Sequence, residues 1–102
     1  MTVSTKELAR LVDIVTNALQ AHDKAVSAYD HKDYVAWRTA QDAADKALMA
    51  TLTEKAGAVF TYRPAIEHRV RIAGISSTST SSCAGAVHNW KRAAALLIAR
   101  EG

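Results

Sequence analysis

The sequence predicts an all-α fold, a small helical bundle built on a long antiparallel helical hairpin plus one or two C-terminal helices. Three observations support this prediction. Alanine is abundant in the 102 residues, whereas there are only 4 Gly and 1 Pro, and this composition favours helix over sheet. Two long segments repeat apolar residues with helical spacing, and a shorter segment near the C-terminus does the same. We therefore treat residues 1–102 as a single helical domain.

The first predicted helix spans residues 4–31. Ser4 and Glu7 have the spacing of a capping box at its start. The following apolar or semi-apolar positions alternate steps of four and three, which defines a seam for packing against another helix. The seam consists of Leu8, Val12, Val15, Leu19, His22, Val26 and Tyr29. This helix is longer than the core of such a small domain requires, which makes it a candidate contact for a homodimer.

The second predicted helix spans residues 34–56 and pairs with the first as a hairpin. Alanines along it permit close approach of a neighbouring helix. Its predicted inward face consists of Tyr34, Trp37, Ala40, Ala44, Leu48 and Leu52. Gly57 fits the position just after the helix, because glycine adopts the left-handed conformation at no cost. Trp37 is most simply a core anchor, as is Trp90, and either would be a candidate protein-binding residue if exposed.

Residues 58–74 form a predicted connection with a short helix at residues 65–73. Val59 to Arg63 alternate like a strand, but we find no partner strand and predict an extended segment. For the next residues two patterns compete. Ile66, Val70 and Ala73 share a helical face, whereas the period-two series through Ile66, Val70 and Ile72 indicates a strand. The helix is our first interpretation and the strand the alternative.

Residues 75–82 form a predicted Ser/Thr loop that leads into the terminal helix at residues 82–100. Seven consecutive hydroxyl residues, Ser76 to Ser82, compete with helix formation by bonding to their own backbone. The run lies between basic residues, so it has two interpretations. It is either an anion site at a helix N-terminus or a solvated loop that contributes an N-cap, and the absence of a Gly-rich phosphate motif favours the loop.

Charge is distributed unevenly along the chain. Residues 1–57 hold seven Lys or Arg and eight Asp or Glu, whereas residues 58–102 hold six and two. The C-terminal half is therefore the part suited to an anionic partner. A single cysteine excludes an internal disulfide, and we find no signal peptide or membrane span. These features predict a soluble cytoplasmic protein without a membrane partner.

The sequence gives little evidence for a catalytic site or a metal site. The four histidines lack ligand spacing, so no metal or other cofactor is expected. Cys83 lies at a helix start, where the helix dipole lowers a thiol pKa, but His88 is five residues away and off its face. Cys83 also occupies an apolar seam position, which favours a buried, inert thiol. We predict a protein that is not an enzyme.

The remaining candidates for contact with an anion or a partner lie in the C-terminal half. They are Arg69, Arg71, Ser82, His88, Asn89, Lys91 and Arg92. Two segments, Gly74-Ile-Ser76 and Ala86-Val-His-Asn-Trp-Lys-Arg92, resemble fragments of the helix-turn-helix repressor signature. That resemblance implies groove-facing roles for Ser82, His88, Asn89 and Lys91 and a phosphate contact for Arg92. The fragments are separated by Ser77 to Gly85, whereas they nearly adjoin in the family, and this spacing favours a plain core role for Val87 and Trp90.

The whole chain, a short alanine-rich helical protein with a Gly-Ile-Ser segment before a final Asn-Trp helix, resembles small accessory and regulatory proteins of temperate and transposable bacteriophages. This resemblance implies a non-enzymatic regulator or inhibitor that binds a larger protein or complex, such as an anti-CRISPR or other anti-defence factor. Our leading hypothesis is therefore a protein partner. The alternative is a nucleic-acid-binding regulator that uses the basic C-terminal half.

Overall fold

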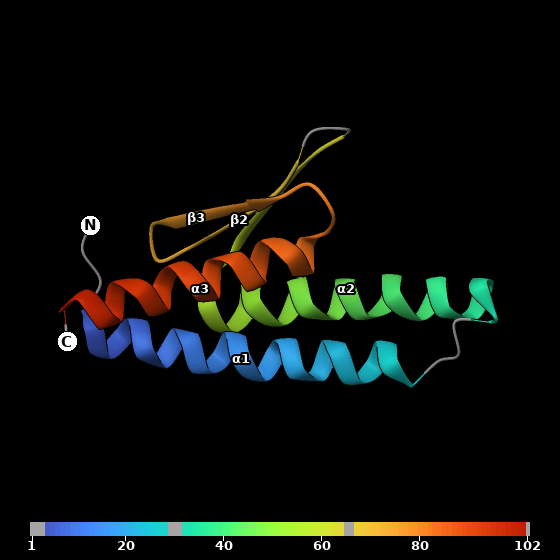
Figure 1. The fold of residues 1–102 in the computed structure, drawn as a ribbon, viewed down its shortest axis with the longest axis horizontal. Helices are drawn as coiled ribbons and strands as arrows, with labels where there is room; N and C mark the ends of the chain where they lie inside the picture. Colours follow the sequence, from blue (N-terminus) through green and yellow to red (C-terminus); the bar gives the residue numbers. More distant parts are fainter. Residues whose placement is uncertain (1–3, 29–31, 65–66, 102) are drawn as a thin grey trace.

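The computed structural model describes residues 4–28, 32–64 and 67–101 and shows an α+β fold. Three helices and a three-stranded antiparallel sheet follow one another in the order α1, α2, β1, β2, β3, α3. The helices lie on one side of the sheet (Figure 1). The prediction of an all-α helical bundle is therefore wrong.

The first two helices form the predicted antiparallel hairpin. Helix α1 spans Thr5–Ser27 and α2 spans Tyr34–Ala56. Half of the capping box forms, because the Ser4 hydroxyl accepts a hydrogen bond from the Glu7 amide at 3.1 Å while the Glu7 carboxylate bonds to Arg10 instead. Gly57 ends α2 in the left-handed conformation, with φ of 64°, as its lack of a Cβ allows.

The seam of α1 packs mainly within the chain. Leu8, Val15 and Leu19 are buried, and Val12, His22 and Val26 are half-buried, whereas Tyr29 lies outside the described residues. The His22 side chain is 8% exposed, and its Nε2 lies 2.6 Å from Asp45 Oδ1 on α2. This pair is a polar link between the two helices. The homodimer contact along α1 stays a prediction, with much of its seam already occupied.

The sheet consists of β1 (Val59–Arg63), β2 (Glu67–Ile72) and β3 (Ile75–Ser79), with β2 in the centre. Ile72 pairs with Ile75, so a two-residue turn joins β2 and β3. Its residues, Ala73 and Gly74, have φ values of 53° and 79°. Positive φ at both positions is the geometry of the type I′ turn, whose twist matches that of a hairpin.

The sheet replaces the predicted short helix at residues 65–73, of which Ala65 and Ile66 lie outside the described residues. It also replaces the first part of the predicted loop at residues 75–82. The physical reason is mutual pairing. The alternating segment Val59 to Arg63 finds its partner in β2, and β2 is paired on its other side by Ile75 to Ser79. Ser and Thr in β3 bond through their backbone, so a hydroxyl-rich run serves as an edge strand. The period-two interpretation of β2 was correct.

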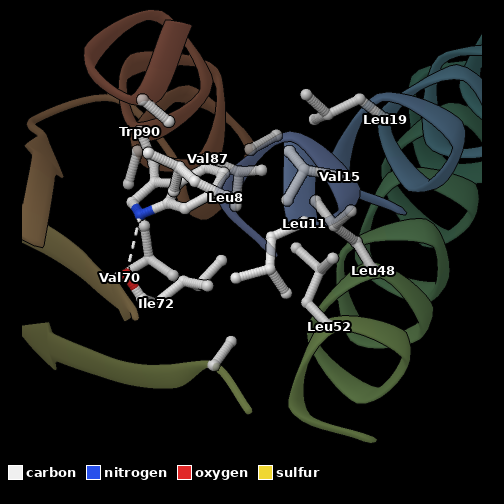
Figure 2. Close-up of a cluster of buried hydrophobic side chains, with 14 residues drawn as sticks. Leu8, Leu11, Val15, Leu19, Leu48, Leu52, Val70, Ile72, Val87 and Trp90 are labelled. Atoms are coloured by element: carbon white, nitrogen blue, oxygen red, sulfur yellow. Dashed lines mark hydrogen bonds between the residues drawn. The ribbon is translucent and has the colours of Figure 1, made fainter. Parts of the chain in front are cut away.

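Helix α3 (Cys83–Glu101) covers the inner face of the sheet and packs against α1. Trp90 is fully buried at the centre of this contact, and its Nε1 donates a hydrogen bond to the Ile72 carbonyl at 3.1 Å. Figure 2 shows the indole between the sheet residues Val70 and Ile72 and the leucines of α1. Trp90 is thus the core anchor expected from the sequence, and it joins three layers, which are α1, α3 and the sheet.

Candidate functional site

The outer face of the sheet, which none of the described helices covers, is the candidate site. Strand alternation places Val70 and Ile72 toward α3 and therefore turns Arg69 and Arg71 outward. Cross-strand pairs extend this face over all three strands. We define the basic sheet face by its residues: Val59, Thr61, Arg63, Glu67, Arg69, Arg71, Ser76 and Thr78.

The register arranges these side chains in rows across the sheet. Arg69 stands between Thr61 and Thr78, and Arg71 stands between Val59 and Ser76. Each arginine is therefore flanked by a hydroxyl residue on β3, about 5 Å away at the usual strand separation. Arg69 and Arg71 are two residues apart on one strand, which corresponds to about 7 Å. The rows form a flat surface of guanidinium and hydroxyl groups.

The charge of this face is only partly neutralised. Glu67 pairs across the strands with Arg63, and its carboxylate lies 3.4 Å from an Arg69 nitrogen, with the Arg69 side chain 50% exposed. An exposed pair of this kind contributes little to stability. In the described part of the chain, no ion pair within 4.0 Å involves Arg63 or Arg71. Both guanidinium groups are therefore available to an external anion.

The structure separates the predicted binding residues into three groups. Arg69 and Arg71 lie together on the basic sheet face, whereas His88 and Arg92 are exposed on α3, on the opposite side of the sheet from them, and Lys91 is half-buried. Ser82 is the N-cap of α3, since its hydroxyl accepts a hydrogen bond from the Gly85 amide at 2.9 Å.

Asn89 has a structural contact as well. Its Nδ2 donates a hydrogen bond to the Thr78 carbonyl at 2.8 Å, which ties α3 to the edge strand β3. Ser82 and Asn89 thus have structural hydrogen bonds within the chain, although Asn89 is exposed and Ser82 half-buried. The helix-turn-helix resemblance assigns Gly74 and Ile75 to a turn between two helices. In the structure they belong to a β-hairpin instead.

Sequence reasoning missed Thr61 and Arg63 as members of the site, and it considered Ser76 and Thr78 only as part of the hydroxyl run. The signal that would have found them is the period-two pattern in residues 59–63 and 66–72. Had both segments been interpreted as strands, every second residue would have fallen on one face with Arg69 and Arg71. The basic character of the C-terminal half was visible, but its concentration on one sheet face was not.

Cys83 is a buried thiol at the start of α3, as expected. Burial raises its pKa to about 11, and the negative charge of Asp45 raises it in the same direction, outweighing the backbone hydrogen bonds that lower it. The thiol is therefore protonated at neutral pH and a poor nucleophile. Within the described residues, no three His, Cys, Asp or Glu side chains are grouped in a way that would hold a metal ion.

A second surface feature is a groove of about 980 Å³ between α2, the outer end of the β1–β2 hairpin and the start of α3. Its charges are mixed. Arg38, Lys46 and Arg63 line it, but so do Asp42, Asp45 and Glu67. Because cations and carboxylates alternate around it, the groove favours no simple anion or cation. The basic sheet face has the clearer chemical character.

Comparisons of the chain with protein-family models, with curated proteins and with solved structures found no match. In the described segments, no helix is both long and apolar enough to cross a membrane. What the chain binds is therefore argued from the chemistry of its surfaces.

Proposed function

We propose that this chain is a binding protein without catalytic activity, and that its basic sheet face contacts the phosphate backbone of a nucleic acid. The observation that carries the proposal is the composition of that face. Apart from Val59 and Glu67, all of its members are Arg, Ser or Thr. These are side chains that donate hydrogen bonds to phosphate oxygens.

The geometry suits a chain of phosphates. A guanidinium group presents parallel N–H donors to one phosphate, and it stays charged at all physiological pH values. Arg69 and Arg71 present two such groups along one strand, and the hydroxyls of Ser76 and Thr78 stand beside them. The centres of protein-binding surfaces, in contrast, are apolar and rich in aromatic residues. The basic sheet face therefore favours a nucleic acid over an apolar protein surface.

The face carries no aromatic residue, which affects the expected specificity. Tyr62 and His68 belong to the opposite face of the sheet and stack on each other, with ring centroids 4.6 Å apart. Stacking on bases is the main source of affinity for unpaired nucleotides in many sheet-based binders. Without it, binding here rests on phosphate contacts and shows little dependence on base sequence.

The proposal is tested by measuring the affinity for a fluorescently labelled 20-nucleotide oligonucleotide at two salt concentrations. Contacts from three arginines give a log–log salt dependence with a slope of about −2 to −3. Affinity should then fall about 16- to 64-fold between 50 and 200 mM salt. Binding should be similar for oligonucleotides of different sequence. The absence of binding at 50 mM salt, or affinity that salt does not change, would contradict the proposal.

A second candidate function, binding to a protein partner, is supported by the end of the helical hairpin. Figure 1 shows the C-terminal part of α1 and the N-terminal part of α2 extending beyond α3 and the sheet. Tyr34 and Val35 are 60% and 74% exposed there, and the Tyr34 ring lies 6.1 Å from that of Trp37. Exposed Tyr and Trp residues are common protein-binding hot spots. The resemblance to phage-encoded regulators and inhibitors belongs with this candidate.

The two candidates use different residues, so a double variant of the hairpin end separates them. Tyr34→Ser with Val35→Ser removes the apolar patch and leaves the basic sheet face unchanged. Under the second candidate, this variant no longer retains a protein that the wild type captures from a lysate of its host after nuclease treatment. If wild type and variant capture the same proteins, the hairpin end is not the binding surface.

A further inference from the structure

The two edges of the sheet differ. At the β3 edge, Asn89 donates to the Thr78 carbonyl and ties the strand to α3. Strand β1 has β2 on one side only, and among the described residues no hydrogen bond from an element other than β2 reaches its backbone between Val59 and Arg63. Figure 1 shows the β1–β2 hairpin projecting away from the helices. An unpaired edge of this kind is a template for another strand.

Exposed apolar side chains gather at the same strand. Val59 is 59% and Tyr62 61% exposed, and they are two of the five large hydrophobic residues found exposed in the described part of the chain. Natural edge strands are commonly blocked by lysine, proline or a bulge. The stretch from Val59 to Tyr62 has none of these, and its β-branched and aromatic residues have high strand propensity. Arg63 and Pro64 come only at the end of the strand.

We propose that β1 pairs with β1 of a second copy of this chain, antiparallel and centred on Thr61, to form a six-stranded sheet. The strand is self-complementary in this register. Thr61 faces Thr61 of the partner, Phe60 faces the partner's Tyr62, and Val59 faces the partner's Arg63. Aromatic cross-strand pairs of this type stabilise antiparallel sheets. In this register, residues that face each other are both odd-numbered or both even-numbered. The two side chains of each pair therefore lie on the same face of the sheet.

Charge is compatible with the pairing. The two Arg63 residues stand on opposite sides of the two-fold axis, about 14 Å apart at about 3.4 Å per residue. Each has Glu67 of its own chain on one side and Val59 of the other copy on the other. No like charges therefore oppose each other across the new edge. The pairing also continues the basic sheet face from one copy into the next, so the dimer presents twice the number of arginines on one surface.

This inference goes beyond the proposed function and is tested without nucleic acid. Sedimentation of nuclease-treated protein at about 100 µM should give a mass twice the 11.0 kDa of the chain. Tyr62→Lys places a charge on the inner face of the edge strand and removes the aromatic pair. It should return the protein to a monomer. A monomeric wild type overturns the inference, whatever the protein binds.

A pair of cysteine variants tests the register. Thr61→Cys places a thiol on the two-fold axis, whereas Thr78→Cys places one in the same row, on the same face, at the opposite edge of the sheet. Under mild oxidation Thr61→Cys should form a disulfide-linked dimer at least about 10-fold faster than Thr78→Cys. Because both replaced threonines are exposed, both variants should fold. Equal rates, or faster linkage of Thr78→Cys, would overturn the proposed edge contact.

Discussion

The two faces of β2 share a backbone but have opposite roles. Val70 and Ile72 are fully buried against α3 and Trp90, whereas Arg69 and Arg71, which alternate with them, are exposed. Alternation along one strand thus places core packing on the inner face and binding chemistry on the outer face. The lesson is that stability and binding should be separable here by substitutions at adjacent positions.

The largest loss of stability is expected from Trp90→Ala. The indole is fully buried among residues of α1 and the sheet, and its Nε1 bonds to the Ile72 carbonyl. Truncation leaves a cavity and removes this hydrogen bond, at a cost of about 3 to 5 kcal/mol in the free energy of unfolding. Urea denaturation followed by circular dichroism measures this loss.

Trp37→Ala is the matched control, because Trp37 is half-buried and lies outside the central cluster. It should cost clearly less than Trp90→Ala. Trp90→Phe keeps most of the apolar volume and should fall between the two. If both alanine variants lost the same stability, Trp90 would not be the anchor that joins the three layers.

A smaller loss is expected from Gly85→Ala. A Cβ at Gly85 would lie 2.6 Å from the Ser79 Oγ and 3.2 Å from its Cβ, so β3 and the first turn of α3 would have to separate. Overpacking of this kind costs about 1 to 3 kcal/mol, and the better helix propensity of alanine offsets up to about 1 kcal/mol. The net loss should be about 1 kcal/mol by urea denaturation.

Ser79→Ala provides the test of this cause. In that background the nearest clashing atom is absent, so Gly85→Ala should become less costly than in the wild type. A double-mutant cycle measures the difference. An unchanged cost would show that the close approach of β3 to α3 is not what requires glycine at position 85.

Cys83 should react slowly with thiol reagents. Burial and Asp45 raise the pKa of the thiol to about 11, so at pH 8 its thiolate fraction is at least about 100-fold below that of an ordinary cysteine. The unfolded chain loses this proton at lower pH than the folded one. The Cys83 contribution to stability is therefore present below about pH 9 and declines as pH rises toward 11. Rapid labelling of the native protein at pH 8 would contradict this account.

The helical hairpin was predictable from sequence because each helix carries its own signals. Ser4 and Gly57 mark the beginning of α1 and the end of α2, and the helix-period apolar residues between them need no distant information. The sheet was not predictable in this way. Whether residues 67–72 form a strand depends on partners on both sides, and one partner is a Ser/Thr run that local propensity assigns to a loop.

The candidate site was predictable only in part for the same reason. Arg69 and Arg71 were identified by their charge and their position near the hydroxyl run. We grouped Arg69 and Arg71 with Lys91 and Arg92 because these residues are close in sequence. In the structure the first two lie on the outer face of the sheet, and the last two lie on α3, on its other side. Arg63 joins them through the register of β1 and β2, which requires knowledge of the strand pairing.

The central claim, that binding belongs to the outer face of the sheet, is tested most directly by two double variants with equal changes in charge. Arg69→Glu with Arg71→Glu reverses the basic sheet face, and Arg92→Glu with Arg100→Glu reverses two exposed residues of α3. The measurement is the affinity of each for the labelled 20-nucleotide oligonucleotide at 50 mM salt. We predict a loss of at least about 30-fold for the first variant, with unchanged unfolding in urea, and less than about 3-fold for the second. Equal losses in the two variants, or no loss in the first, would contradict the claim.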